Sequence, residues 1–151
     1  MPSRTTKAHP PQSTLEHHCE AFGLRMTPMR REVLDELLES GRPQSAYQLM
    51  AAMERRLSRR ILPPTVYRAL SFLQENGFVS RLESRNTFVA SAELSSSGCR
   101  LFFICDTCGA AAESGDPELE AVLDALATAR SFLVRRQVLE VEGTCRTCAS
   151  P

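Results

Sequence analysis

Apolar residues recur at helical spacing through the first half of the chain, and turn-forming residues interrupt them at intervals. The pattern predicts four helices, which cover Leu15–Phe22, the stretch from Pro28 to Gly41, the stretch from Ser45 to Leu57, and Pro64–Asn76. Thr27 stands directly before Pro28, which is a favoured cap followed by a favoured first helical residue. Ser45 stands three residues before Gln48 and forms a capping-box sequence with it, so two of the four starts carry their own signals.

The fourth predicted helix has two distinct faces. Its apolar residues are expected in the core and are Val66, Ala69, Leu70 and Leu73. The residues that point away from them are Thr65, Tyr67, Arg68 and Ser71. The helix therefore presents hydroxyls, a phenol and a guanidinium together on its exposed side.

Beyond residue 77 the pattern favours strands. Phe78–Glu83 and Thr87–Ala90 flank a turn at residues 84–86, and three helices followed by a β-hairpin make a winged helix. The second half predicts strands over 100–104, 110–113 and 132–141, with a helix over 117–130. We expect an α+β protein with a disordered tail (1–13), a winged-helix domain (14–92), a serine-rich hinge (93–98) and an α/β domain (99–151).

Composition indicates where the protein works. The chain has 151 residues, 42% of them hydrophobic, and no run approaches the ~20 apolar residues of a membrane span. The first 13 residues are rich in Pro, Ser and Thr and lack the apolar segment of a secretory signal. We therefore expect a cytoplasmic protein with no membrane partner, whose six cysteines stay reduced.

Charge is divided unevenly along the chain. Residues 1–85 carry 13 Lys and Arg against 9 Asp and Glu, whereas residues 86–151 carry 5 against 9. A basic half suits a polyanionic partner, although a solvated surface of uneven charge explains the same numbers.

The exposed side of the fourth helix has the chemistry of a DNA-recognition helix. Arg68 can donate two parallel hydrogen bonds to a guanine, and Tyr67 can bond a phosphate or pack on a thymine methyl. Thr65, at the helix N-terminus, is placed for a phosphate, and Arg81 and Arg85 of the hairpin could reach the adjacent backbone. The alternative is an ordinary polar face, but the order of helices and basic hairpin favours double-stranded DNA.

Two Cys-x-x-Cys pairs are the strongest metal signal in the sequence. Cys105 and Cys108 are separated by 36 residues from Cys145 and Cys148, and each pair closes a predicted strand. Four such thiolates match the ligand set of one structural zinc per subunit. A redox dithiol or buried free thiols are the alternatives, and a thiol oxidoreductase is disfavoured because both pairs lie at strand ends.

Several motifs together resemble the ferric uptake regulator family of bacterial metal-responsive repressors. They are Arg25-Met26-Thr27-Pro28-Met29-Arg30, Pro63-Pro64-Thr65-Val66-Tyr67-Arg68-Ala69-Leu70, Gly77-Phe78-Val79 and Phe103-Ile104-Cys105-Asp106-Thr107-Cys108-Gly109. The second motif, with Glu83-Ser84 and Gly143-Thr144-Cys145, is most similar to the zinc uptake regulator branch. The resemblance covers about residues 15–149. It implies a homodimer, joined by the C-terminal domain, that binds an AT-rich inverted repeat upstream of metal-uptake genes and is not an enzyme; Arg25 joins the expected DNA-binding residues.

The resemblance also implies a second, sensing zinc at the hinge, held by His, Cys, His and Glu. These ligands fall at Ser80, Ser91, Gly98 and Glu113, so only the last is kept. A rearranged site is the alternative, using Cys99 with Glu113, and His17, His18 or Cys19 if the first helix lies nearby. The favoured interpretation is that Cys99 is a small buried residue and the histidines form a solvated helix face, so a second regulatory zinc is doubtful. The second hypothesis is therefore a family regulator that needs no sensing metal, or that responds to another signal through Cys99 or through His17, His18 and Cys19.

Overall fold

The computed structural model describes residues 12–91, 94 and 98–149. The chain divides into two compact units, residues 1–96 and residues 97–151. The class is α+β, as predicted. None of the helices in the described ranges is long and apolar enough to cross a membrane.

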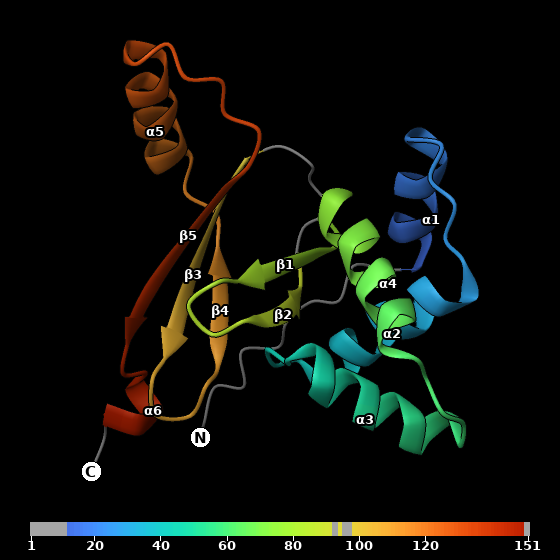
Figure 1. Ribbon diagram of the computed structural model, residues 1–151. Coiled ribbons are helices and arrows are strands. Elements are labelled where there is room, and N and C mark those ends of the chain that lie inside the picture. Colours follow the sequence, from blue (N-terminus) through green and yellow to red (C-terminus); the bar gives the residue numbers. More distant parts are fainter. Residues whose placement is uncertain (1–11, 92–93, 95–97, 150–151) are drawn as a thin grey trace. The chain divides into compact units, whose positions relative to one another are not determined.

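The first unit is built from four helices and a hairpin (Figure 1). The helices are α1 (Gln12–Ala21), α2 (Pro28–Ser40), α3 (Ala46–Leu57) and α4 (Pro63–Glu75), and the strands are β1 (Val79–Leu82) and β2 (Thr87–Ala90). The two strands are antiparallel, with Val79 opposite Ala90. A separate bridge between Gln44 and Phe88 ties the α2–α3 connection to β2. This is the predicted winged-helix order.

Local sequence signals set the helix ends of this unit. The Thr27 side chain accepts from the Arg30 amide, and Gly41 ends α2 in the left-handed conformation at φ 59°. Ser45 and Gln48 form the predicted capping box, with bonds of 3.2 Å and 2.8 Å to each other's backbone amides. All three predicted signals are confirmed.

Apolar side chains from every element of the first unit meet in one core. The four expected residues of α4 are all buried, and they pack with others from α2, α3 and the hairpin, including Leu34, Leu49 and Phe78. Leu94, at the end of this unit, is partly buried against the same cluster. The core is what holds α4 with its other face outward.

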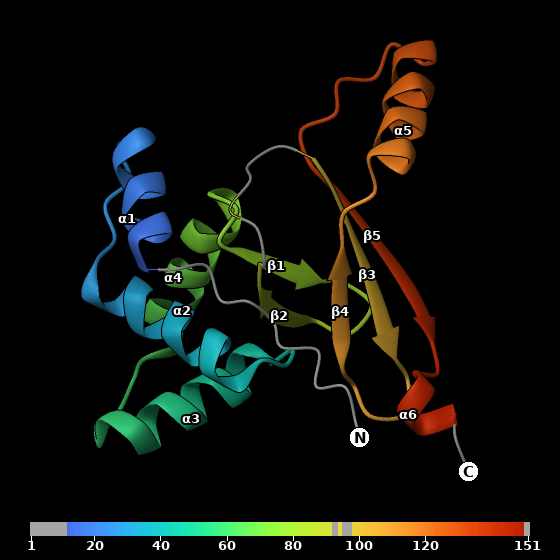
Figure 2. The ribbon, with the colours of Figure 1, turned by 180° about the vertical axis from the view of Figure 1, so that it is seen from behind.

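The second unit is a three-stranded sheet with two helices (Figure 2). Its elements are β3 (Cys99–Cys105), β4 (Ala111–Ser114), α5 (Pro117–Ala129), β5 (Gln137–Gly143) and α6 (Arg146–Ala149). The strand order is β4-β3-β5, with β4 antiparallel and β5 parallel to β3. In both views α5 stands beyond one end of the sheet instead of covering a face, and none of its residues is buried.

Three element predictions are corrected by the structure. The first helix begins at Gln12, so residues 12 and 13 are helical and not part of a tail; residues 1–11 lie outside the described residues. The last strand covers Gln137–Gly143 instead of 132–141, because β3 begins at Cys99 and offers no partner before Gln137. The short α6, which was not predicted, carries the last cysteine pair's turn. Of the predicted hinge, only Leu94 and Gly98 are among the described residues.

Candidate metal centre and nucleic-acid interface

The four cysteines of the two Cys-x-x-Cys pairs come together at one end of the second unit's sheet. Cys105 ends β3, and its partner strand β5 ends opposite it at Gly143, two residues before Cys145. Because β3 and β5 are parallel, both Cys-x-x-Cys turns lie at the same end of the sheet. Among the described residues, these four are the one group of His, Cys, Asp or Glu side chains clustered closely enough to hold a metal ion.

The distances fit a tetrahedral zinc. All four sulfur atoms lie within 4.8 Å of one another, and the Sγ atoms of Cys108 and Cys145 are 3.9 Å apart. With Zn–S bonds of about 2.3 Å, a tetrahedral site has sulfur–sulfur edges of about 3.8 Å. The cluster is thus already close to the size that the ion requires.

Backbone groups shape the two turns. The Cys145 amide donates to the Cys105 sulfur at 3.3 Å, and the Asp106 amide donates to the Gly143 carbonyl at 2.9 Å. The Asp106 carboxylate accepts from the Thr144 hydroxyl at 3.3 Å, which links the turns a third time. Gly109 follows the first pair with φ +71°, a conformation that L side chains rarely adopt.

The thiols of the cluster do not ionise alike. The Cys145 amide, followed by that of Cys108, lowers the pKa of Cys105 to about 6. Hydrogen bonding to Cys145 and then Cys108 raises the pKa of Cys148 to about 12. Four thiolates this close repel one another, so a divalent cation is what would let all four ionise. The donor set therefore fits zinc.

Glu113, the one retained member of the expected sensing site, already has a cationic partner. Arg100 donates to its carboxylate at 3.2 Å, and both side chains are largely buried, with 14% and 12% exposed. The strand pairing places Glu113 opposite Phe102 on β3. This carboxylate is therefore part of a buried ion pair within the second unit.

Cys99 is half-buried at the start of β3. Burial, and then the carboxylates Glu120, Asp116 and Asp124, raise the pKa of its thiol. A raised pKa works against the thiolate that a zinc ligand or a nucleophile needs. The structure thus places Cys99 among acidic groups that disfavour its ionised form.

The other positions named for sensing are divided between the units: Gly98 is exposed at the start of the second unit, and the rest lie in the first unit. Ser80 and Ser91 are buried, and the Ser91 hydroxyl has no hydrogen-bond partner in the part of the chain that the structure describes. His18 is buried, with its ring nitrogen 3.3 Å from the Asn76 carbonyl oxygen and its ring 5.1 Å from that of Phe78. His17 is exposed, and burial raises the pKa of the Cys19 thiol.

The expected recognition face of α4 is exposed. Tyr67 is 53% exposed, Arg68 and Ser71 are exposed, and Thr65 is half-buried in the first turn. Arg68 makes no hydrogen bond or ion pair with any residue that the structure describes. Its guanidinium is thus available to a partner outside the chain.

The two wing arginines differ from Arg68. Arg81 donates to the Asn86 side chain at 2.9 Å and pairs with Glu83 at 3.3 Å, so it fixes the hairpin. Arg85 is half-buried and engaged in an interaction of its own. Arg25 is exposed in the α1–α2 connection, where its carbonyl oxygen accepts from Arg30 at 2.6 Å.

Two exposed residues of the first unit were not picked out from the sequence. Tyr47, in the first turn of α3, is 79% exposed, and Leu62, the N-cap of α4, is 64% exposed. Large apolar side chains left in water mark contact surfaces when they gather. For Tyr47 the signal was available, because it follows the capping serine and falls off the apolar period of α3.

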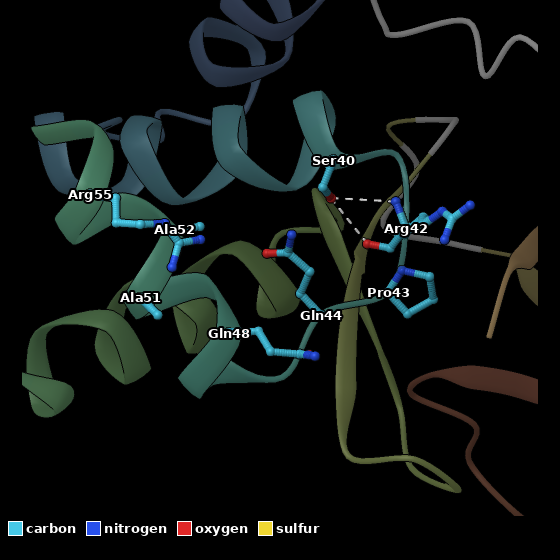
Figure 3. A pocket seen from close by; sticks show the side chains of 8 residues that line it. All are labelled: Ser40, Arg42, Pro43, Gln44, Gln48, Ala51, Ala52 and Arg55. Carbon is cyan, nitrogen blue, oxygen red and sulfur yellow. Dashed lines mark hydrogen bonds between the residues drawn. The ribbon is translucent and has the colours of Figure 1, made fainter. Parts of the chain in front are cut away.

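A shallow cavity of about 360 Å³ lies between the end of α2 and the start of α3 (Figure 3). It is lined by Ser40, Arg42, Pro43, Gln44, Gln48, Ala51, Ala52 and Arg55. The Ser40 hydroxyl donates to the Arg42 carbonyl and accepts from its amide, which holds the loop at the rim. None of the residues expected to bind metal or DNA lines it.

Comparison with known proteins identifies close relatives. The model of the ferric uptake regulator family matches residues 21–142. The zinc uptake regulation protein of Escherichia coli is 37% identical over 142 residues, which cover 88% of this chain and 78% of the relative. The peroxide operon regulator of Bacillus subtilis is 30% identical, with 94% and 95% covered.

Solved structures agree with these relatives. A zinc uptake regulator complexed with zinc and DNA superposes with a TM-score of 0.82 at 36% identity, covering 90% of this chain and 91% of that one. The crystal structure of holo XcZur gives 0.80 at 41% identity, with 92% and 96% covered. These similarities extend over both units of the chain.

Proposed function

The chain belongs to the ferric uptake regulator family, and we propose that it is a zinc-responsive repressor that binds double-stranded DNA as a homodimer. As a member of this family it is a transcription regulator and not an enzyme. The proposed target is an AT-rich inverted repeat upstream of metal-uptake genes. The protein would act in the reducing cytoplasm, where its thiols stay free to bind metal.

The observation that carries this proposal is the exposed Arg68 on α4, which has no hydrogen bond or ion pair among the described residues. Because the opposite face of the helix is buried in the core, Arg68 and Tyr67 are held outward on a rigid element. A guanidinium so placed can donate two hydrogen bonds to guanine O6 and N7 in the major groove. A zinc uptake regulator of the same fold has been solved in complex with zinc and DNA, which supports this role.

We assign the structural zinc to Cys105, Cys108, Cys145 and Cys148. When bound, the ion neutralises thiolates and links the end of β3 to the end of the chain. The close sulfur cluster and the low pKa of Cys105 support the assignment.

The second unit offers the surface for a second copy of the chain. On α5, Val122 is 56% exposed and Leu126 47% exposed, at helical spacing on one side. The strand β5 is an edge of the sheet, with β3 on one side only among the described strands. An unpaired strand edge and an uncovered apolar helix face are both satisfied by a two-fold dimer.

The second candidate is a family regulator whose DNA binding needs no sensing zinc. The Glu113–Arg100 ion pair favours it, because a metal would have to displace a buried cation from that carboxylate. The serines at positions 80 and 91 favour it too, since hydroxyls are poor zinc ligands. Under this candidate the structural zinc is the one metal of the subunit.

The test is an affinity measurement with Arg68→Ala, on a duplex selected in vitro by the wild-type protein and on a scrambled duplex of equal length. We expect the selected duplex to lose about 1–3 kcal/mol of binding free energy per contact, and the scrambled duplex to lose much less. Equal losses on both duplexes would contradict a base-reading role for Arg68. Arg42→Ala is the matched control, because it removes the same charge from an exposed arginine outside the expected DNA-binding residues, and it should leave the preference for the selected duplex unchanged.

The same assay, repeated across a range of free zinc, separates the two candidates. A zinc-responsive repressor binds the selected duplex more tightly as zinc rises through the physiological range. An affinity that stays flat after the structural site has filled supports the second candidate.

A further inference from the structure

Arg30, in the first turn of α2, joins two parts of the first unit that carry expected DNA contacts. Its guanidinium carbon lies 3.4 Å from the centre of the Phe72 ring on α4. Its Nη1 atom donates to the Arg25 carbonyl oxygen at 2.6 Å. One side chain thus connects the α1–α2 loop, the start of α2 and the recognition helix.

Phe72 lies on the same helix as Arg68, close to the expected DNA-binding residues. Phe72 follows Arg68 by four residues, so the two lie one turn apart on the same side of α4. The Arg30 guanidinium over the Phe72 ring therefore lies next to the recognition face. The peptide group of Arg25 is held there with it.

The Arg30 guanidinium has few other interaction partners among the described residues. It forms no ion pair with a carboxylate in the described part of the chain, unlike its neighbour Arg31, which pairs with Asp35 at 2.9 Å. A planar cation held by a ring on one side and a carbonyl at its edge has a fixed orientation, which the flexible lysine side chain would not reproduce. No carboxylate of the described residues neutralises this charge, so Arg30 adds to the positive potential beside the recognition face.

We propose that Arg30 is a positioning residue, which sets the Arg25 loop beside the reading face of α4 by stacking on Phe72. It acts through Arg25 and does not itself contact DNA. The inference rests on the proposed DNA-binding function and adds a residue to its machinery.

A double-mutant cycle tests the proposal. The full-length, zinc-loaded protein is measured against the duplex selected by the wild type, for Arg25→Met, Arg30→Met and the double variant. We expect each single change to weaken binding about tenfold, the size of one lost side-chain contact. In the Arg25→Met background, Arg30→Met should weaken binding less than about twofold, because the residue it positions is already gone.

Arg30→Lys separates geometry from charge. Lysine keeps the cation but loses the planar stack, so we expect it to leave binding nearly as weak as Arg30→Met does. Arg31→Met removes the same charge one residue away and should leave the affinity within about twofold of wild type. Thermal melting and zinc content of each variant show whether a loss of binding reflects unfolding.

Three outcomes would overturn the positioning role. They are equal effects of Arg30→Met in both backgrounds, full restoration of binding by Arg30→Lys, and an Arg25→Met variant that binds like wild type. The proposed function fails separately, if neither Arg68→Ala nor Arg25→Met weakens binding to the selected duplex.

Discussion

Every helix and strand of the first unit contributes buried apolar side chains to one core, whereas the described part of the second unit buries few apolar side chains. In the first unit, α2, α3 and α4 each bury several side chains, and both strands of the hairpin add more. Among the described residues of the second unit, the buried apolar ones come from β3 and β4, chiefly Phe102 and Ile104, while α5 buries none. A small unit with so thin a core needs a metal, a partner or both to be stable.

This difference also separates the two kinds of site. The residues expected to contact DNA stand on a helix that packs against this core, so their positions do not depend on a ligand. The cysteine cluster stands at the open end of a sheet, where the bound ion itself would supply the missing stability. The first unit is therefore stable without its expected DNA-binding site being occupied, whereas the stability of the second unit is expected to depend on a metal in the cysteine cluster.

The largest difference between the two units is expected when zinc binding is removed. Cys105→Ser should abolish metal binding and unfold the second unit, since structural zinc contributes on the order of 10 kcal/mol. Hydrogen exchange should show lost protection in β3 and β5, with α2 and α4 still protected.

Cys99→Ser is the matched control, because it changes a cysteine of the same strand that lies outside the cluster. It should keep one zinc per subunit. A Cys105→Ser protein with unchanged zinc content and unchanged protection of β3 would refute the structural role.

The next effect concerns the core of the first unit. Leu34 is 1% exposed on α2, and Leu34→Ala should lower the free energy of unfolding by about 2–5 kcal/mol. Chemical denaturation followed by circular dichroism measures this loss. Zinc content should not change, because the cluster lies in the other unit.

Leu133→Ala makes the same chemical change at a side chain that is 81% exposed, and it should cost far less. Comparable losses of unfolding free energy for both leucines would mean that Leu133 contributes to stability as a buried residue does, despite its exposure.

A smaller effect is expected at the proposed dimer surface. Leu126→Glu places a charge on the apolar side of α5 and should weaken dimerisation at least about 30-fold, the loss typical of a central interface residue. Sedimentation equilibrium measures the dissociation constant.

Thr128→Glu adds the same charge to the same helix, away from the Val122–Leu126 side, and should leave the dimer intact. A Leu126→Glu protein that remains dimeric at low micromolar concentration would place the interface elsewhere, for example on β5 alone.

The accuracy of the element predictions followed the local signals. The helices of the first unit begin and end close to where Thr27, Ser45 and Gly41 place them, because caps act within a few residues. The last strand was misplaced because its start depends on where β3 begins, a partner 38 residues earlier in the chain. The helix over 12 and 13 was missed because proline, serine and threonine there resemble a tail.

The metal centre and the sensing positions also differ in whether local sequence or tertiary packing sets them. The spacing of the cysteines was enough to predict the cluster, since two residues between ligands suit one ion. No local pattern indicated that Arg100 engages Glu113, or that Ser80, Ser91 and His18 lie in a core. Those facts follow from strand register and helix packing.

The sequence by itself indicated the family and predicted the recognition face of α4 and the four-cysteine cluster, because each rests on residue types at short, fixed spacing. Only the tertiary structure decided which charges are already paired and which remain available. It showed that Arg68 has no partner within the described ranges while Arg81 is held within the hairpin, and that Arg30 joins Arg25 to Phe72. Partners distant in sequence are chosen by the packing of the whole unit, and no local pattern contains that information.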